Sequence, residues 1–188
     1  MKTILHCSLS AFESIRNHVL QNEDEQAAFI FLEWVQTNDI LNLTVKDHYL
    51  VQRHELVGDN SLHIDISDET LSRVIQKAAK ENLALGEVHS HPFVKRNVKF
   101  SWSDMAGFEE FVPHVSWRLR QKPYVALVFG RNDFDALAWP SDPVAPVQLD
   151  SITIDRNTVL KPTNRTLKTN RKYQDDRNKI FETRSSDR

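Results

Sequence analysis

The stretch GEVHSHPFVKRNVKFSWSD, residues 86–104, places two histidines two positions apart and follows them with a proline. The short apolar run before them predicts a strand, and Pro92 ends it because proline cannot donate to a sheet ladder. Side chains two apart on a strand point to the same face, so His89 and His91 can direct both imidazoles at one ion. Neutral imidazole is a preferred zinc ligand. Taken alone, the pair favours two ordinary surface or core histidines, so the residues that follow decide.

The same stretch ends in a second polar pair, Ser101 and Asp104, at the predicted start of a helix. Side chains three apart on a helix lie on the same face. Ser-x-x-Asp is also a capping box, which needs no chemistry, but a capping serine can hold an aspartate in position for a metal. Two imidazoles and one carboxylate, with water as the fourth ligand, form the open tetrahedral set of a catalytic zinc ion. The sequence therefore predicts one Zn²⁺ bound by His89, His91 and Asp104.

A catalytic zinc site also needs a general base, and two glutamates are candidates. Zinc lowers the pKa of its water toward neutrality, and a nearby carboxylate takes the proton and hands it to the leaving amine. Glu25 opens the most apolar segment of the chain, EQAAFIFLEW, where partial burial is expected to raise the pKa of its carboxyl group. Glu87 lies two residues before His89, on the same strand face. Composition and spacing do not choose between them.

The rest of the chain predicts a mixture of helices and strands without regular βαβ alternation. Apolar periodicity predicts helices at residues 9–22, 67–83 and 103–119, the last at least as far as Pro113. Strands are expected at residues 25–34, 40–54 (one or two), 84–91, 123–130, 134–140 and 147–154, with a hairpin around residues 130–133. This pattern predicts a single α+β domain of three layers.

Length and composition limit the class of protein. The chain has 188 residues, enough for one well-buried domain and too few for a (β/α)8 barrel. Its single cysteine, Cys7, excludes an intrachain disulfide and a cysteine-based zinc ribbon. The opening MKTILHCSLS lacks the pattern of a signal peptide, and no later apolar run has the length of a membrane span. We therefore expect a cytoplasmic protein without a membrane partner.

The net charge of −2 hides an asymmetry between the two ends of the chain. Residues 156–188 hold ten Lys and Arg against four Asp and Glu, which leaves the first 155 residues at about −8. We expect a folded domain at residues 1–155 and a basic, extended tail at residues 156–188 that is solvated or docks an acidic partner. No recognisable nucleic-acid-binding motif accompanies the tail, so specific nucleic-acid binding is not expected.

Taken together, a glutamate before an apolar strand, Gly-x-x-His-Ser-His-Pro and Ser-x-x-Asp resemble the JAMM (MPN-plus, JAB-domain) zinc metalloproteases of prokaryotic type. The resemblance covers residues 25–104 and implies a three-layer α/β/α fold, a mixed sheet between helices as in cytidine deaminases, extending to about residue 150. By position it implies that Glu25 is the general base and that Ser101 donates a hydrogen bond to the oxyanion. It also implies that the zinc ligands are His89, His91 and Asp104.

The chain departs from the family pattern at two places, and its tail carries a further resemblance. Glu87 occupies a position where members usually carry a bulky aromatic or apolar residue. The loop FVKRNVKF, residues 93–100, is longer than in most members, which leaves Ser101 and Ser103 both open as the oxyanion donor. The tail segment NRKYQDDRNKIF, residues 170–181, resembles the entry to an adenylating domain, and some short members are associated with ThiF-type activating enzymes.

The resemblance implies a zinc metallopeptidase or isopeptidase, similar to deubiquitinases. It would hydrolyse the bond after the C-terminal glycine of a ubiquitin-like or sulfur-carrier protein, with zinc-activated water and Glu25 as general base. The alternative is a catalytically inactive MPN scaffold in a protein complex, although inactive members generally lose the ligands that this chain keeps. A zinc nucleoside deaminase requires Cys-x-x-Cys, which one cysteine cannot supply.

Overall fold

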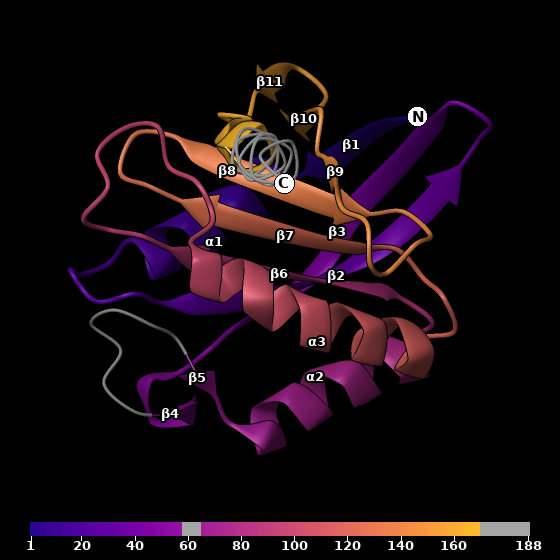
Figure 1. Ribbon diagram of the computed structural model, residues 1–188, viewed down its shortest axis with the longest axis horizontal. Coiled ribbons are helices and arrows are strands. Elements are labelled where there is room, and N and C mark those ends of the chain that lie inside the picture. The colour runs from indigo at the N-terminus through magenta and orange to yellow at the C-terminus, as the bar shows by residue number, and fades with distance from the viewer. Residues whose placement is uncertain (58–64, 170–188) are drawn as a thin grey trace, which may run out of the picture.

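The computed structural model describes residues 1–57 and 65–169, which form an α+β fold around one large mixed sheet (Figure 1). Its strands, within the described residues, run in the order β11-β10-β1-β3-β2-β6-β7-β8-β9. They are β1 (Lys2–Cys7), β2 (Ala27–Gln36), β3 (Ile40–Leu50), β6 (Ala84–Ser90), β7 (Tyr124–Phe129), β8 (Phe134–Trp139), β9 (Val147–Gln148), β10 (Ser151–Ile154) and β11 (Thr158–Leu160). The helices are α1 (Leu9–Val19), α2 (Asp68–Lys80) and α3 (Trp102–Arg118), and a small hairpin of β4 (Leu56–Val57) and β5 (Asp65–Ile66) follows the 3-10 turn η1 (Arg53–Glu55).

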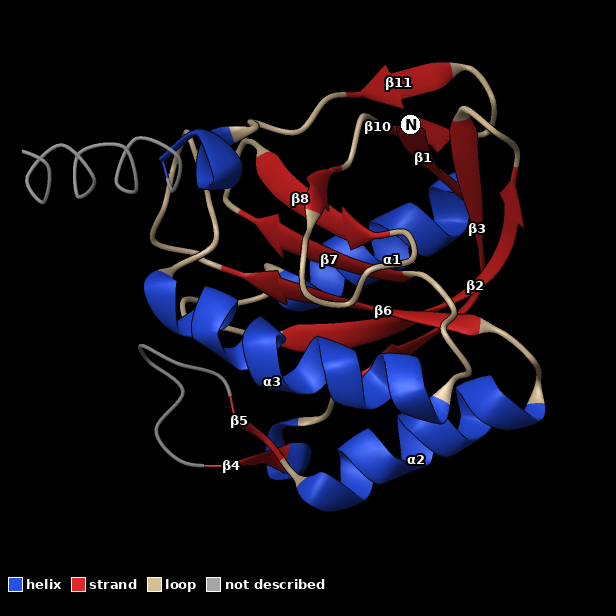
Figure 2. Cartoon of the chain, turned by 45° about the vertical axis from the view of Figure 1, so that its right-hand side comes forward, coloured by secondary structure: helices blue, strands red, loops and turns tan. Residues whose placement is uncertain are grey.

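Helices cover both faces of the sheet, with α1 behind it and α2 and α3 in front (Figure 2). This arrangement explains the apolar run at residues 27–32, the buried part of β2, which lies between β3 and β6. The even-numbered residues 28–32 join the core that includes α1, and the odd-numbered residues 27–31 join the core that includes α2 and α3. A strand buried on both faces has no polar positions to alternate, so its sequence is continuously apolar.

The three expected helices are confirmed, and each begins behind a serine N-cap. The side chains of Ser8, Ser67 and Ser101 each accept a hydrogen bond from the backbone N–H three residues later, which satisfies one of the open donors of the first turn. Helix α3 continues through Pro113 to Arg118. None of the described helices is long and apolar enough to cross a membrane.

Strand β1 was not anticipated, and the single strand expected at residues 147–154 is wrong. That segment forms two strands: β9 pairs with β8, and β10 pairs with β1 near the other edge of the sheet. Only Leu149 and Asp150 separate them; Leu149 N–H donates to Ala136 on β8 (3.2 Å), and Asp150 N–H donates to Thr3 on β1 (2.9 Å). The sheet is therefore strongly curled, because its β8 side and its β1 side meet at this crossing.

The folded part of the chain continues past the boundary expected at residue 155. Strand β11 pairs antiparallel with β10, and residues 165–169 are helical. The buried carboxylate of Asp135 on β8 accepts hydrogen bonds from Asn164 N–H (3.0 Å), Thr166 N–H (2.9 Å) and the Thr166 hydroxyl (2.6 Å). The expected extended tail is thus incorrect for residues 156–169, since this buried acceptor binds the segment to the sheet. The remainder of the tail, with the expected ThiF-related segment at 170–181, lies outside the described residues.

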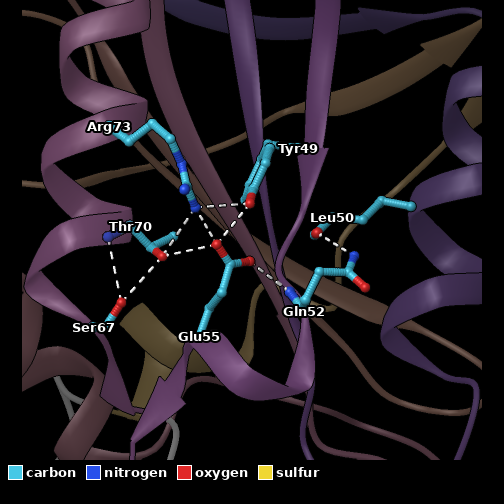
Figure 3. Close-up of polar contacts among 7 residues, drawn as sticks. All are labelled: Tyr49, Leu50, Gln52, Glu55, Ser67, Thr70 and Arg73. Atoms are coloured by element: carbon cyan, nitrogen blue, oxygen red, sulfur yellow. Dashed lines mark hydrogen bonds and ion pairs between the residues drawn. The ribbon is translucent and has the colours of Figure 1, made fainter.

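Glu55 ties the chain after β3 to helix α2 (Figure 3). The strand expected at residues 40–54 ends at Leu50, and the turn that follows buries the Glu55 carboxylate. It accepts hydrogen bonds from Tyr49 Oη (2.7 Å), Thr70 Oγ1 (2.9 Å) and Gln52 N–H (2.8 Å), and Arg73 forms an ion pair with it. A buried carboxylate with this many donors is fully compensated, so the network holds α2 against the sheet.

Candidate metal centre

The two histidines lie at the end of β6, in the middle of the sheet. His89 is the second-last residue of β6, and His91 follows the strand directly. Hydrogen bonds from both neighbouring strands hold the backbone of residues 89–91. Ser90 N–H donates to Gln26 O (3.2 Å) on the β2 side, and His91 N–H donates to Phe129 O (2.8 Å) on β7. Both side chains are buried. The imidazoles are therefore placed by sheet hydrogen bonds on both sides rather than by a free loop.

Asp104 comes from the first turn of α3, where the predicted capping box is formed. Asp104 N–H donates to Ser101 Oγ (3.1 Å), and Ser101 N–H donates to Asp104 Oδ2 (2.6 Å). The reciprocal pair fixes the carboxylate with respect to the helix axis. In this orientation Asp104 Oδ2 lies 3.4 Å from the Nε2 atom of His89 and 3.4 Å from the Nε2 atom of His91.

His89, His91 and Asp104 together could bind a metal ion. Their ligand atoms all lie within 4.8 Å of one another. His89 Nε2 is buried and has no hydrogen-bond partner among the described residues, although it faces the aspartate. A buried ring nitrogen without a partner is costly, and a cation among the three ligand atoms would compensate it. The donor set of two imidazoles and one carboxylate therefore fits a divalent metal such as zinc.

The charges around the three ligand atoms also favour a cation. Burial raises the pKa of Asp104, but contacts with the two imidazoles and with Ser101 N–H outweigh burial and hold that pKa well below its usual range. Burial lowers the pKa of His89, and the Asp104 and Glu87 carboxylates outweigh burial and raise that pKa. The centre thus concentrates carboxylates around two imidazoles, which attracts positive charge.

The two candidate bases face different nitrogens. Glu25 precedes β2, which begins at Ala27 rather than at Glu25 as expected, and its buried Oε1 atom lies 3.6 Å from His91 Nε2. It is thus on the side where the ligand atoms converge. Glu87 Oε1 lies 3.5 Å from His89 Nδ1, the nitrogen that points away from Asp104. Only Glu25 is placed beside the metal position.

The two candidate serines lie together at the start of α3. Ser101 Oγ caps the helix, and it lies 2.8 Å from Ser103 Oγ. Ser103 lines a cleft of about 710 Å³ that extends from the metal centre between α2, α3 and β6. The cleft wall mixes apolar residues with acidic ones, the latter being Glu25, Asp65, Asp68, Glu87, Asp104 and Glu110. A chain segment lying in this cleft would have its bonds next to the metal centre.

Sequence reasoning missed the residues that support the histidine rings. Phe100 packs edge-on against His89 (5.5 Å between centroids), and Phe93 stacks on His91 (5.7 Å). Tyr124, from the apolar strand β7, donates its hydroxyl to Glu87 Oε2 (2.9 Å). Both phenylalanines lie within residues 86–104, so their closeness in sequence to the histidines could have identified them as supports for the rings. Nothing in the apolar run of β7 indicates the role of Tyr124, because that role depends on the parallel register of β6 and β7.

A scan against protein-family models finds no match for this chain, and a search of curated proteins finds none either. Among solved structures, the chain is similar to protein DSY2949 from Desulfitobacterium hafniense, whose structure was determined in solution. The match has a TM-score of 0.52 at 14% sequence identity and covers 81% of this chain and 94% of that one. At this identity the likeness concerns the fold alone. It supports the α+β architecture and carries no information about activity.

Proposed function

We propose that this protein is a zinc metallopeptidase of the JAMM (MPN-plus) type. Its substrate would be the peptide or isopeptide bond after the C-terminal glycine of a ubiquitin-like or sulfur-carrier protein. The observation that carries the proposal is the convergence of His89 Nε2, His91 Nε2 and Asp104 Oδ2, with Glu25 beside them. The mixed sheet with α1 on one face and α2 and α3 on the other supports the three-layer MPN fold (Figure 2).

Zinc fits the donor set, with His89, His91 and Asp104 as its ligands, and when bound it would supply a Lewis acid that makes water a stronger nucleophile at neutral pH. The buried carboxylate of Glu25 takes a proton from the attacking water molecule and returns it to the leaving amine, so that the C–N bond breaks and the carbonyl carbon gains a hydroxyl group. The Ser101 hydroxyl, held at the helix start, donates a hydrogen bond to the carbonyl oxygen as negative charge develops on it.

The cleft supports a polypeptide substrate. The cleft runs from the metal centre along α2 and α3, and the apolar side chains of Ile66, Leu71 and Phe111 are among those that line it. We infer that an extended chain end lies there with its terminal glycine next to the metal centre. A ThiF-type activating enzyme as partner belongs to the same proposal and rests on the sequence of residues 170–181.

The test combines metal analysis with a substitution of the base. The purified protein is expected to hold one zinc ion per chain and to cleave a ubiquitin-like fusion at the glycine, with cleavage stopped by a chelator and products weighed by mass spectrometry. Glu25→Gln should keep the zinc and lower turnover by at least about 10²-fold, the range for loss of a general base. Glu13→Gln, on the exposed side of α1, is the matched control and should change neither. A metal-free protein, or full activity in Glu25→Gln, would refute the proposal.

A further inference from the structure

We propose that Glu87 is a positioning residue of the metal centre, which orients the His89 imidazole so that its Nε2 atom faces the metal. The inference rests on the metal-binding part of the proposed function and does not depend on which bond the protein cleaves. Glu87 has no role in the family resemblance, and the structure places it against a ligand rather than against the reacting groups.

The two nitrogens of His89 face two different carboxylates. Nε2 lies 3.4 Å from Asp104 Oδ2, within the group of metal-ligand atoms, and Nδ1 lies 3.5 Å from Glu87 Oε1. A neutral imidazole carries one N–H and one lone pair, and the hydrogen-bond partner of one nitrogen decides which tautomer is present. With a carboxylate at Nδ1, the N–H stays on that nitrogen and the lone pair of Nε2 is directed at the metal. This carboxylate–histidine–metal arrangement orients the ring and makes it a better ligand.

Glu87 is itself held in place by Tyr124. The Tyr124 hydroxyl donates to Glu87 Oε2 (2.9 Å), so the two oxygens of the carboxylate serve the tyrosine and the histidine separately. Tyr124 is 1% exposed, and its ring packs edge-on against Phe111 and Trp139. Burial, and then the charge of Glu87, raise the pKa of Tyr124 well above its ordinary value, so its hydroxyl remains a donor.

The strand register makes this chain of contacts rigid. Glu87 and His89 lie on the same face of β6, and β6 runs parallel to β7, where Tyr124 pairs with Leu85. The His89 ring is confined on another side by Phe100. Tyr124, Glu87 and His89 therefore form a connected series from the core of the sheet to the metal position. Glu87 is partly buried, with 20% of its side chain exposed, and its two contacts compensate the loss of solvent.

The experiment measures zinc affinity and the tautomer of His89, neither of which requires catalysis. Zinc is added to the metal-free full-length chain in the presence of a chromophoric chelator, whose competition for the ion reports the affinity. The protonation of the histidine ring nitrogens is followed by long-range ¹H–¹⁵N spectra with and without zinc. In the wild type, zinc should bind Nε2 of His89 while Nδ1 keeps its proton. Glu87→Ala should lower zinc affinity by about 10- to 100-fold, the cost of losing such an outer partner, and should mix the two tautomers.

Conservative variants separate positioning from folding. Glu87→Gln keeps an oxygen that can accept from Nδ1–H and should restore most of the affinity, whereas Tyr124→Phe should weaken zinc binding less than Glu87→Ala. Glu110→Ala, in the same cleft but away from the ring, is the matched control and should bind zinc as the wild type does. Thermal melting of each metal-free variant shows whether it is folded. If Glu87→Ala is not folded, the zinc affinities and His89 tautomers of Glu87→Gln and Tyr124→Phe test the positioning role instead.

The outcomes distinguish this inference from the proposed function. Wild-type zinc affinity in Glu87→Ala with an unchanged His89 tautomer, or zinc bound at Nδ1 of His89, would overturn the positioning role and leave the proposed peptidase standing. A wild type that binds zinc through Nε2 but cleaves no ubiquitin-like fusion would refute the peptidase and leave the positioning role intact. A wild type that does not bind zinc would overturn both.

Discussion

Replacing Asp135 by alanine should both destabilise the protein and loosen the start of α3. Its buried carboxylate accepts five hydrogen bonds, of which three come from Asn164 and Thr166 in the segment after β11. Thr166 in turn accepts from Phe100 N–H (3.0 Å), the residue directly before the capping Ser101. Asp135 thus supports, through one threonine, the loop that leads to Asp104, a candidate metal ligand.

The magnitude follows from the donors that would lose their acceptor. Each buried donor left unsatisfied costs about 1–3 kcal/mol, so the three donors of Asn164 and Thr166 set a range of about 3–9 kcal/mol. Because this segment can detach and hydrate its N–H groups, the lower part of the range, about 3–5 kcal/mol, is expected. Thr166→Val removes one hydroxyl and should cost about 1–2 kcal/mol.

Urea unfolding followed by tryptophan fluorescence measures the effect. Asp135→Ala should lower the urea concentration at the unfolding midpoint by the loss in free energy of unfolding divided by the slope of that free energy against urea concentration. Its zinc affinity should also fall, because the loop before Ser101 loosens. Thr169→Val is the matched control, since Thr169 is exposed and its hydroxyl donates to the backbone carbonyl of Arg165 rather than to Asp135. A loss below about 1 kcal/mol for Asp135→Ala would refute the argument that this carboxylate anchors the C-terminal segment, because three unsatisfied donors cannot cost so little.

Three further outcomes are expected. Burial raises the pKa of Glu55, but its hydrogen bonds and Arg73 outweigh burial and lower that pKa. The contribution of Glu55 to stability is therefore present above the unfolded pKa of about 4.3 and is lost as the pH falls through the lower folded pKa. The free energy of unfolding, measured between neutral and acid pH, should fall less in Glu55→Gln than in the wild type, and an equal fall would contradict this. Gly86→Ala should cost about 1–3 kcal/mol in urea unfolding, since its Cβ would lie 2.8 Å from the Val125 carbonyl oxygen, and a neutral result would mean that β6 and β7 separate easily. Zinc at about 1,000 times its Kd should stabilise the chain by about 4 kcal/mol in thermal melts, and the same stabilisation in His91→Ala would show that the ion binds elsewhere.

Local chemistry made part of the candidate site predictable. The His-x-His spacing, the proline and the Ser-x-x-Asp capping box each depend on residues a few positions apart, and strand and helix periodicity then determines which face they share. The apolar run of β2 was equally informative, because burial on both faces removes every polar position. These features predicted a mixed α+β fold and a group of His89, His91 and Asp104, and the three side chains do lie together.

Contacts between distant segments were not predictable in the same way. No local pattern distinguishes the Nε2 side of a histidine from its Nδ1 side, so composition and spacing left Glu25 and Glu87 as equal candidates, and only the family resemblance favoured Glu25. The split of residues 147–154 into β9 and β10 depends on the curl of the whole sheet, and the place of residues 156–169 depends on one buried acceptor, Asp135.

For this protein, the sequence by itself determined which side chains share a face and where helices begin, because these depend on backbone periodicity and on capping within one turn. Only the tertiary structure decided which carboxylate faces which nitrogen, that Tyr124 supports Glu87, and that the chain after residue 155 returns to the sheet. The physical reason is that these contacts depend on strand order and register, which result from the packing of segments up to 147 positions apart, as between Thr3 and Asp150.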